Sequence, residues 1–330
     1  MREWRYTKKI KMLIYFLFVI GFVLLIKGAD LLVDGSASIA KRLNISNIVI
    51  GLTIVAFGTS APEFIVNFFA SLNGNTDIAI GNILGSNIAN ILLILGISAI
   101  VYPLVTQKNT VWKEIPLSLL AIIVVGVMAN DAFIDGSSTS ALTRIDGIIL
   151  LCFFAIFMFY TFGIAKVVGD ENQGDEIKDL GYWKSSLYII GGLIGLVVGG
   201  KWIVDGAVEI ATIFGISQSL IGLTVVAVGT SLPELATSAI AAYKKQTDIA
   251  IGNVVGSNIF NLFWILGFSA LVRPLPFSLD SNSDILMTIF ASALLFIIMF
   301  IGKKHVIEKW QGIVMVVLYF TYIVFLILTK

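Results

Sequence analysis

The sequence has very few charged residues, one cysteine and one histidine. Asp, Glu, Lys and Arg make up 13% of its 330 residues, whereas soluble domains carry roughly 25%. Cys152 has no second cysteine with which to form an internal disulfide, and His305 alone excludes a zinc site built from several histidines. The net charge of +1 gives no electrostatic reason to expect nucleic acid as a partner. No feature indicates an obligate protein partner.

Long apolar runs dominate instead. The chain is 58% hydrophobic and its mean hydropathy is +0.96, so we expect an all-α integral membrane protein embedded in the lipid bilayer. A membrane helix needs about 20 apolar residues. This criterion predicts ten spans, near residues 12–33, 45–72, 78–101, 115–130, 145–165, 186–212, 216–242, 249–271, 284–302 and 309–328.

The N-terminal run begins with basic residues, as a signal peptide does. It lacks a small-residue cleavage site and is long enough to span, so we interpret it as the first membrane helix. The most polar loop, residues 166–184, lies between the fifth and sixth spans and is predicted to be a solvated linker.

The chain contains an internal repeat. When residue n is aligned with residue n+171, 31 of the 54 positions from 51 to 104 are identical without a gap. One unit holds five predicted spans, and because five is odd, the second copy must cross the membrane in the opposite sense. This is the inverted repeat of many secondary transporters, and a duplicated scaffold without transport is the weaker alternative. The predicted units are residues 1–165 and residues 185–330, joined by the 166–184 linker.

The loop charges predict the orientation. Loops after odd-numbered spans carry twelve Lys or Arg residues, whereas loops after even-numbered spans carry only Arg144 and Arg273. Positively charged short loops stay in the cytoplasm. We therefore expect both termini outside and the 166–184 linker in the cytoplasm, although the basic N-terminal tail argues the other way.

A polar motif interrupts two of the apolar spans. It reads "GTSAPEF" at residues 58–64 and "GTSLPEL" at residues 229–235. Pro62 and Pro233 cannot donate a helical hydrogen bond, so each frees a backbone carbonyl four residues earlier. At membrane depth such carbonyls, like the carboxylates of Glu63 and Glu234, need protein, water or a cation as partner. A single buried glutamate can be a packing residue, but two at matching positions favour function.

The spans that follow the motif add further oxygen atoms. They contain "GNILGSNIAN" at residues 81–90 and "GNVVGSNIFN" at residues 252–261. Ser86 and Asn90 are four residues apart and share a helix face, as do Ser257 and Asn261. Carboxylate, hydroxyl, amide and carbonyl oxygens suit Ca²⁺, Na⁺ or Mg²⁺ and do not suit soft metals.

Charge compensation predicts competition at this site. No Lys or Arg lies in these spans close to the two glutamates, and buried unpaired carboxylates are very costly. A site with a charge of −2 accepts one Ca²⁺, several Na⁺ or protons, but not all at once. Mutually exclusive binding at one site is the physical requirement for antiport.

At these motifs the chain resembles the Ca²⁺:cation antiporter superfamily, in particular the prokaryotic sodium/calcium exchanger proteins. The doubled motif is specific, and the resemblance covers essentially the whole chain. It implies that Glu63 and Glu234 are the central carboxylates shared by Ca²⁺ and Na⁺. It also implies further ligands, namely Thr59, Thr230, Ser60, Ser231, Ser86, Ser257, Asn90, and the backbone carbonyls of Ala56 and Ala227.

Asn261 departs from part of this family, because some members, including the K⁺-dependent branch, have an aspartate at that position. Asn261 remains a candidate ligand, but it carries no charge, which makes K⁺ dependence less expected. The resemblance further implies alternating access, in which the first and sixth helices slide against a rigid core.

The leading hypothesis is therefore a Ca²⁺/Na⁺ antiporter of a prokaryotic cell membrane, which is not an enzyme and uses no cofactor because its ions are substrates. The alternative is a Ca²⁺/H⁺ exchanger in which the same two glutamates take protons. A channel has little support, since no multi-subunit filter motif is present. An intramembrane hydrolase has even less, because no histidine partners the serines and HExxH is absent.

Overall fold

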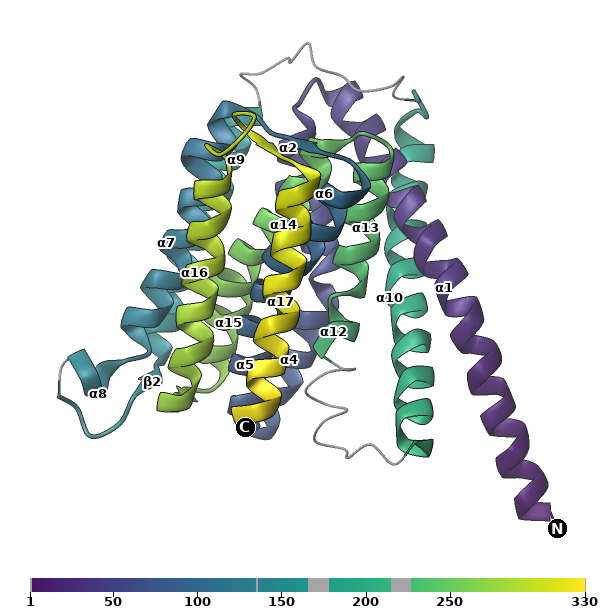
Figure 1. Cartoon of the computed structure of the whole chain (residues 1–330), viewed down its shortest axis with the longest axis horizontal. Helices are drawn as coiled ribbons and strands as arrows, with labels where there is room; N and C mark the ends of the chain where they lie inside the picture. The colour runs from purple at the N-terminus through teal and green to yellow at the C-terminus, as the bar shows by residue number, and fades with distance from the viewer. Residues whose placement is uncertain (1, 135, 166–177, 215–226, 330) are drawn as a thin grey trace.

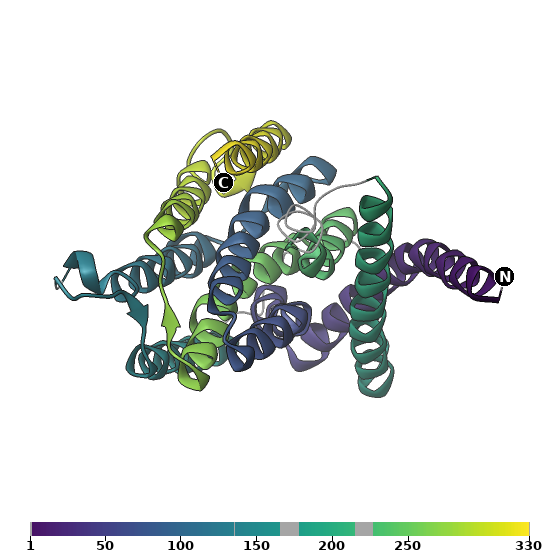
Figure 2. The same cartoon turned by 90° about the horizontal axis from the view of Figure 1, so that it is seen from below.

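The computed structural model describes residues 2–134, 136–165, 178–214 and 227–329. Nearly all of these residues lie in helices that run side by side along one direction (Figure 1). Seen from one end of the molecule, the helices form an elongated cluster, with α1 and α10 toward one end (Figure 2).

The first half of the chain holds the helices up to α9. Their bounds are α1 Arg2–Leu43, α2 Asn47–Ile50, η1 Gly51–Val55, α3 Ala56–Thr59, α4 Ala61–Asn73, α5 Thr76–Ile88, η2 Ala89–Leu95, α6 Gly96–Val101, η3 Thr110–Glu114, α7 Ile115–Met128, α8 Asp131–Ile134 and α9 Arg144–Ala165. The elements η1, η2 and η3 are π-helical turns, which occur frequently at functional sites.

The second half begins with α10. Its helices are α10 Tyr182–Ile213, α12 Ala227–Thr230, α13 Leu232–Tyr243, α14 Thr247–Ile259, the π-helical η5 Phe260–Ile265, α15 Leu266–Val272, the short η6 Leu279–Ser281, α16 Asn282–Ile298 and α17 Lys309–Thr329. The expected span 216–242 begins in residues 216–226, and the expected linker includes 166–177. Both of these stretches lie outside the described residues.

Four two-residue strands connect the halves. β1 Leu104–Val105 pairs antiparallel with β4 Val306–Ile307, and β2 Ala141–Leu142 pairs with β3 Leu275–Pro276. In each case the segment after the third expected span of one half contacts the segment before the last span of the other half. The two halves are therefore joined reciprocally.

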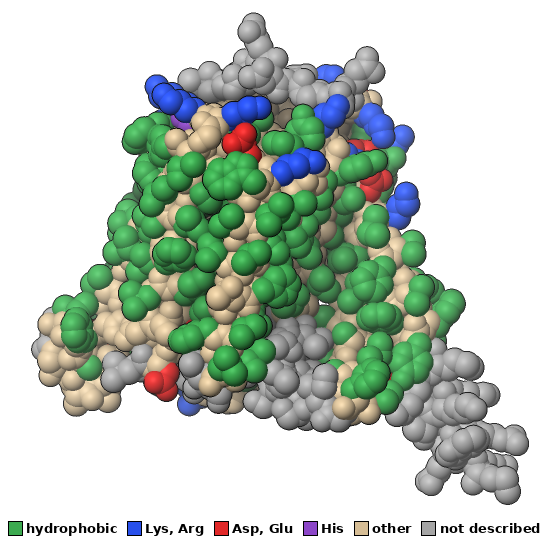
Figure 3. All heavy atoms as spheres, viewed as in Figure 1, with side chains coloured by type: hydrophobic (Ala, Val, Ile, Leu, Met, Phe, Trp, Pro, Cys, Tyr) green, Lys and Arg blue, Asp and Glu red, His purple; other side chains and the backbone are tan. Residues whose placement is uncertain are grey.

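Long apolar helices make up most of the described residues. Seven of them are long and apolar enough to cross a membrane, and the bent pair Asn47–Thr59 and Ala61–Asn73 makes an eighth. The apolar helix α16 is shorter. Apolar side chains cover much of the face seen in the space-filling view, between its two ends (Figure 3), which suits a lipid environment.

The first helix is longer than expected. It continues past residue 33 to Leu43 and ends where Asn44 adopts a φ of 52°. Alanines such as Ala37 and Ala40 remain buried along this extra length, so the helix keeps a packed face beyond its most apolar part. Hydropathy alone underestimates the length of such a helix.

The helices α1 and α10 cross antiparallel in very close contact. A Cβ added at Gly28 would lie 2.7 Å from the carbonyl oxygen of Gly192, and one added at Gly192 would lie 2.7 Å from that of Gly28. Gly21 and Gly199 make the same reciprocal approach. Small residues permit such backbone contact between membrane helices. Gly21 and Gly28 align with Gly192 and Gly199 in the n+171 repeat.

Both ends of the chain lie at one end of the molecule, whereas the end of α9 and the start of α10 lie at the other (Figure 1). Most of the visible Lys and Arg side chains gather at this second end (Figure 3). There Lys244, which follows α13, forms ion pairs with Asp30 at 2.6 Å and Asp34 at 2.5 Å on α1.

Candidate cation-binding site

The two motif segments break their helices at the same place. α3 ends at Thr59 and α4 begins at Ala61, with a bend of 47° between the two helical parts. Ser60 and Ser231 occupy the two break positions with nearly the same backbone, at φ −81°, ψ 5° and φ −88°, ψ 5°. The repeat therefore extends to the local conformation of the chain.

The prolines begin new helices and do not kink continuous ones. Pro62 and Pro233 lie in the first turns of α4 and α13, where a missing N–H breaks no helical hydrogen bond. Glu63 and Glu234 consequently lie in the first turns as well, beside the positive ends of the helix dipoles. These helix termini favour negative charge on the two carboxylates.

Both glutamates are buried, and each has one oxygen without a partner. Their exposed fraction is 1%, and within the described part of the chain neither forms an ion pair with Lys or Arg. The Oε2 atoms of both lack any hydrogen bond. Because buried carboxylates without partners are costly, this arrangement requires a cation or a proton.

The other carboxylate oxygens accept hydrogen bonds across the two halves. The Ser60 hydroxyl donates to Glu234 Oε1 at 3.1 Å, and the Ser231 hydroxyl donates to Glu63 Oε1 at 3.5 Å. Each serine precedes one glutamate in sequence but contacts the glutamate of the other half. The two motifs therefore form a single site.

Two asparagines present amide oxygens without donors. Asn90 in η2 donates through Nδ2 to Asn258 Oδ1 at 3.0 Å, and Asn261 in η5 donates through Nδ2 to Asn87 Oδ1 at 2.9 Å. The Oδ1 atoms of Asn90 and Asn261 are buried and have no partner. Since the nitrogens are held by hydrogen bonds, these oxygens are oriented acceptors.

The segments that carry these asparagines face the glutamate helices. η2 packs against α13, which carries Glu234, and η5 packs against α4, which carries Glu63. Each half thus packs its asparagine-bearing segment against the helix that carries the other half's carboxylate.

The motif threonines contact asparagines of the opposite half. Thr59 Oγ1 lies 2.9 Å from Asn253 Oδ1, and Thr230 Oγ1 lies 3.5 Å from Asn82 Oδ1. Both hydroxyls donate, so the threonines face the asparagines of α14 and α5 respectively.

A further pair of residues supports these asparagines. Asn253 Nδ2 donates to Ser238 Oγ at 2.9 Å, and Asn82 Nδ2 donates to Asn67 Oδ1 at 2.8 Å. Asn67 and Ser238 are not among the site residues predicted from the sequence. The available signal was their spacing, because each lies four residues after a motif glutamate and shares its helix face.

The remaining candidate residues differ in their surroundings. The Ser86 hydroxyl lies within hydrogen-bonding distance of the Ser231 hydroxyl, at 3.4 Å, whereas the buried Ser257 hydroxyl has no partner. The Ala56 carbonyl already accepts from the Ser60 amide at 3.0 Å. Ala227 is the first residue of α12.

The buried side-chain atoms that lack a partner at this site are mostly acceptors, namely Oε2 of both glutamates and Oδ1 of Asn90 and Asn261, beside the Ser257 hydroxyl. In the described ranges no group of three or more His, Cys, Asp or Glu could hold a metal ion, so a cation bound here would take most of its ligands from neutral oxygens. Carboxylate, amide and hydroxyl oxygens are typical ligands of Ca²⁺.

Comparison with known proteins gives consistent matches. The family model described as "Sodium/calcium exchanger protein" matches residues 13–163 and again residues 184–328. The putative antiporter CaxA of Alkalimonas amylolytica is 37% identical over 320 residues, covering 94% of this chain and 98% of that protein. The sodium/calcium exchanger MaX1 of Methanosarcina acetivorans is 31% identical over 346 residues, with coverage of 94% and 98%.

Solved structures of the sodium-calcium exchanger NCX_Mj are also similar. One of them, soaked with 10 mM Na⁺ and no Ca²⁺, has a TM-score of 0.82 and 37% identity, and the alignment covers 95% of this chain and 99% of that one. Another, soaked with 2.5 mM Na⁺ and 0.1 mM Ca²⁺, has a TM-score of 0.81.

Proposed function

The chain belongs to the sodium/calcium exchanger protein family, a family of membrane transporters, and on that premise we propose that it exchanges Ca²⁺ for Na⁺ at the site of Glu63 and Glu234. The two ions bind there alternately. The observation that carries this proposal is the pair of buried carboxylates, each with one unpartnered oxygen.

Electrostatics supports competition at this site. With both glutamates ionised, the site carries a charge of −2, and the described residues supply no basic side chain in ion-pair contact. One Ca²⁺ or several Na⁺ can neutralise that charge, but simultaneous full occupation would reverse it. Loading of one ion therefore expels the other.

We assign the ligands to both halves of the chain. The carboxylates are those of Glu63 and Glu234, and Asn90 and Asn261 contribute their oriented amide oxygens. The other proposed ligands are Thr59, Thr230, Ser60, Ser231, Ser86, Ser257, and the carbonyls of Ala56 and Ala227.

We further propose that ten spans form two inverted five-helix repeats, residues 1–165 and 185–330. The hydrogen bonds Ser60–Glu234 and Ser231–Glu63 support this. In the n+171 alignment Ser60 is equivalent to Ser231 and Glu63 to Glu234, so each bond is the counterpart of the other. The reciprocal strand pairs and the glycine contacts of α1 with α10 support it independently.

Alternating access then requires one part of the molecule to move relative to the other. The helices α1 and α10 are the proposed moving part. They contact each other through glycine backbones, and so close a contact would let the two helices move together as one unit against the other helices. In the cell membrane, both termini face outside and the 166–184 linker is cytoplasmic. The cluster of basic side chains at the linker end supports that orientation (Figure 3).

The test is ⁴⁵Ca²⁺ uptake by proteoliposomes with imposed Na⁺, K⁺ or H⁺ gradients. An outward Na⁺ gradient should drive uptake, and replacing Na⁺ by choline should abolish it. Uptake that is undiminished in choline and follows the pH gradient would replace this proposal with the Ca²⁺/H⁺ alternative.

Variants locate the site. Glu63→Gln and Glu234→Gln should each abolish uptake while the protein remains folded, because each removes a charge and keeps the side-chain volume. Asp284→Asn is the matched control. Asp284 is a buried carboxylate that is not among the candidate ligands, and it accepts a hydrogen bond from Tyr322 of α17 at 2.5 Å. Normal uptake by either glutamine variant would mean that the site is misplaced.

A further inference from the structure

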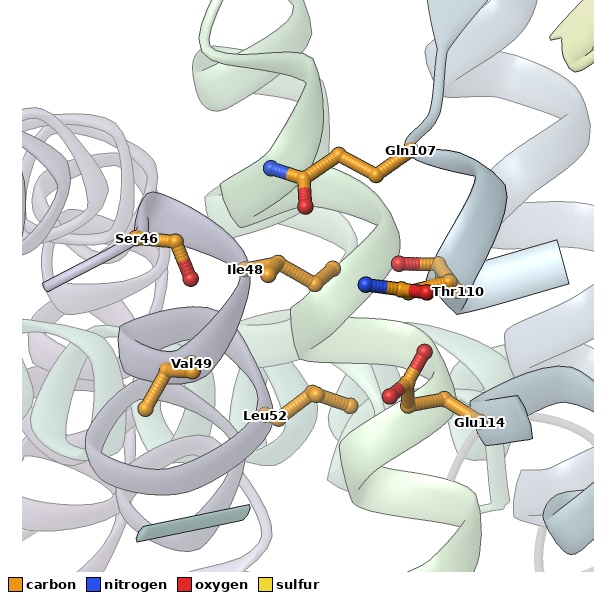
Figure 4. A pocket seen from close by; sticks show the side chains of 8 residues that line it. Ser46, Ile48, Val49, Leu52, Gln107, Thr110 and Glu114 are labelled. Atoms are coloured by element: carbon orange, nitrogen blue, oxygen red, sulfur yellow. The ribbon is translucent and has the colours of Figure 1, made fainter. Parts of the chain in front are cut away.

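A small pocket with an apolar wall and several polar side chains lies between the start of the second span and the start of α7. Its walls come from α2 and η1 on one side and from η3 and the preceding loop on the other (Figure 4). Its lining residues are Ser46, Ile48, Val49, Leu52, Gln107, Asn109, Thr110 and Glu114. None of these is among the candidate ligands of the Glu63 and Glu234 site. The cavity volume is about 10 Å³, which is room for one water-sized particle.

Glu114 provides a buried carboxylate to this pocket. It is 2% exposed, and its Oε1 accepts a hydrogen bond from the Tyr160 hydroxyl at 2.6 Å. Its Oε2 is buried and has no partner. Figure 4 shows the carboxylate turned into the pocket toward Thr110. An unpartnered buried carboxylate oxygen is costly, so the pocket needs an occupant.

Other oxygen atoms converge on the same space. Gln107 donates through Nε2 to Asp248 Oδ2 at 3.0 Å, which leaves its Oε1 as an acceptor, and Figure 4 shows that oxygen directed toward the pocket. Thr110 and Ser46 bring hydroxyl groups. The pocket therefore combines one carboxylate oxygen with several neutral oxygen ligands.

The apolar wall of the pocket raises the energetic cost of leaving the Glu114 carboxylate charge uncompensated. Ile48, Val49 and Leu52 are buried beside these oxygens and lower the local dielectric constant. Lys113 holds its ammonium group 5.7 Å from the centre of the Tyr160 ring, and in the described part of the chain it forms no ion pair with Glu114.

A buried carboxylate that accepts a hydrogen bond from a tyrosine does not always keep a second oxygen without a partner. In the second half, Asp284 on α16 accepts a hydrogen bond from Tyr322, yet neither of its oxygens is left buried without a partner. The open oxygen of Glu114 is thus a property of this pocket and not of the carboxylate–tyrosine pair.

We propose that this pocket binds one monovalent metal cation, for which Na⁺ is the probe, through Glu114 Oε2 and the oxygens of Gln107, Thr110 and Ser46. A single carboxylate neutralises a single positive charge. Ca²⁺ prefers six to eight oxygen ligands and would keep one uncompensated positive charge here, because the lining provides a single carboxylate. The site is separate from the Glu63 and Glu234 site and does not depend on what that site transports.

The experiment measures Na⁺ binding without transport. The full chain carrying Glu63→Gln and Glu234→Gln is purified in detergent, and its unfolding temperature is recorded as NaCl replaces choline chloride at constant ionic strength. An ion that binds only the folded state raises the unfolding temperature with increasing concentration. We expect a rise with Na⁺ in this background and its complete loss when Glu114→Gln is added.

Two further variants make the result specific. Asp284→Asn, added to the same background, should leave the Na⁺ response unchanged. Thr110→Val removes one hydroxyl and keeps the carboxylate, so it should shift the response to several-fold higher Na⁺, and it gives the answer if the Glu114→Gln protein fails to fold.

Three outcomes would overturn the proposal. They are no Na⁺ response in the background protein, a response that survives both Glu114→Gln and Thr110→Val, and a stabilisation that follows falling pH equally well in choline. The last outcome would mean that Glu114 is protonated and that a water molecule fills the pocket.

Discussion

Gly192 and Gly191 are neighbours on α10, but the structure predicts opposite effects for the same substitution. A Cβ at Gly192 would lie 2.7 Å from both the Gly28 carbonyl oxygen and the Leu32 amide nitrogen of α1. Ordinary contacts begin near 3.4 Å, so α1 would have to retreat by about 0.7 Å. Both obstacles are backbone atoms, and no rotamer change can relieve the clash. At Gly191 a Cβ meets nothing within 4 Å among the described residues.

The magnitudes follow from two competing terms. Alanine is favoured over glycine in a helix by up to about 1 kcal/mol, whereas overpacking typically costs about 1–3 kcal/mol. Gly191→Ala should therefore be neutral or slightly stabilising. Gly192→Ala should be less stable than Gly191→Ala by about 1–3 kcal/mol, because it carries the overpacking cost in addition to the same helix-propensity gain.

The assay is thermal unfolding of the two purified variants in the same detergent, together with ⁴⁵Ca²⁺ uptake. Since 1 kcal/mol corresponds to a shift of roughly 2–4 °C for domains of 150–250 residues, we expect a difference of several degrees. Uptake should fall for Gly192→Ala alone, because α1 and α10 would no longer pack closely. Equal unfolding temperatures and equal uptake for both variants would refute the close contact between these helices.

Three further predictions concern charge and orientation. Asn261→Asp adds a carboxylate near the proposed site, so uptake should acquire a dependence on K⁺, and an unchanged rate when choline replaces K⁺ would contradict this. Lys244→Met leaves Asp30 of α1 without its ammonium partner and leaves Asp34 paired only with the exposed Lys178. For such partly exposed pairs we expect a loss of about 1 kcal/mol that shrinks in high salt, measured by thermal unfolding. In a Cys152→Ser background, an impermeant maleimide applied to intact cells should label Ser138→Cys but not Lys108→Cys, and the reverse pattern would invert the proposed orientation.

Much of the fold class could be predicted because it depends on composition and on the repeat. The scarcity of charge and the apolar runs indicated a helical membrane protein, and the doubled motif indicated the family, which the comparisons confirm. Span boundaries were less accurate. α1 extends ten residues past its expected end at residue 33, because small residues that pack well are not strongly apolar.

The candidate site was predictable as a set of residue types but not as a set of contacts. An alignment of n with n+171 states which residues are equivalent, and equivalent residues need not touch. Ser60 contacts Glu234 across a separation of 174 residues, and no local periodicity contains that information. The ligand roles of all twelve candidate residues remain predictions that the transport and mutant experiments test.

The sequence by itself determined that this protein lies in a lipid bilayer, that its two halves are duplicates, and which chemistry its polar residues offer. Hydropathy, identity between halves and side-chain type are properties of the chain. Only the tertiary structure decided which buried oxygens accept no hydrogen bond. Glu63 and Glu234 each have one satisfied and one open oxygen, and so does Glu114 in its separate pocket. That distinction depends on which donors the packed helices bring within hydrogen-bonding distance, and those donors come from segments far away in the sequence.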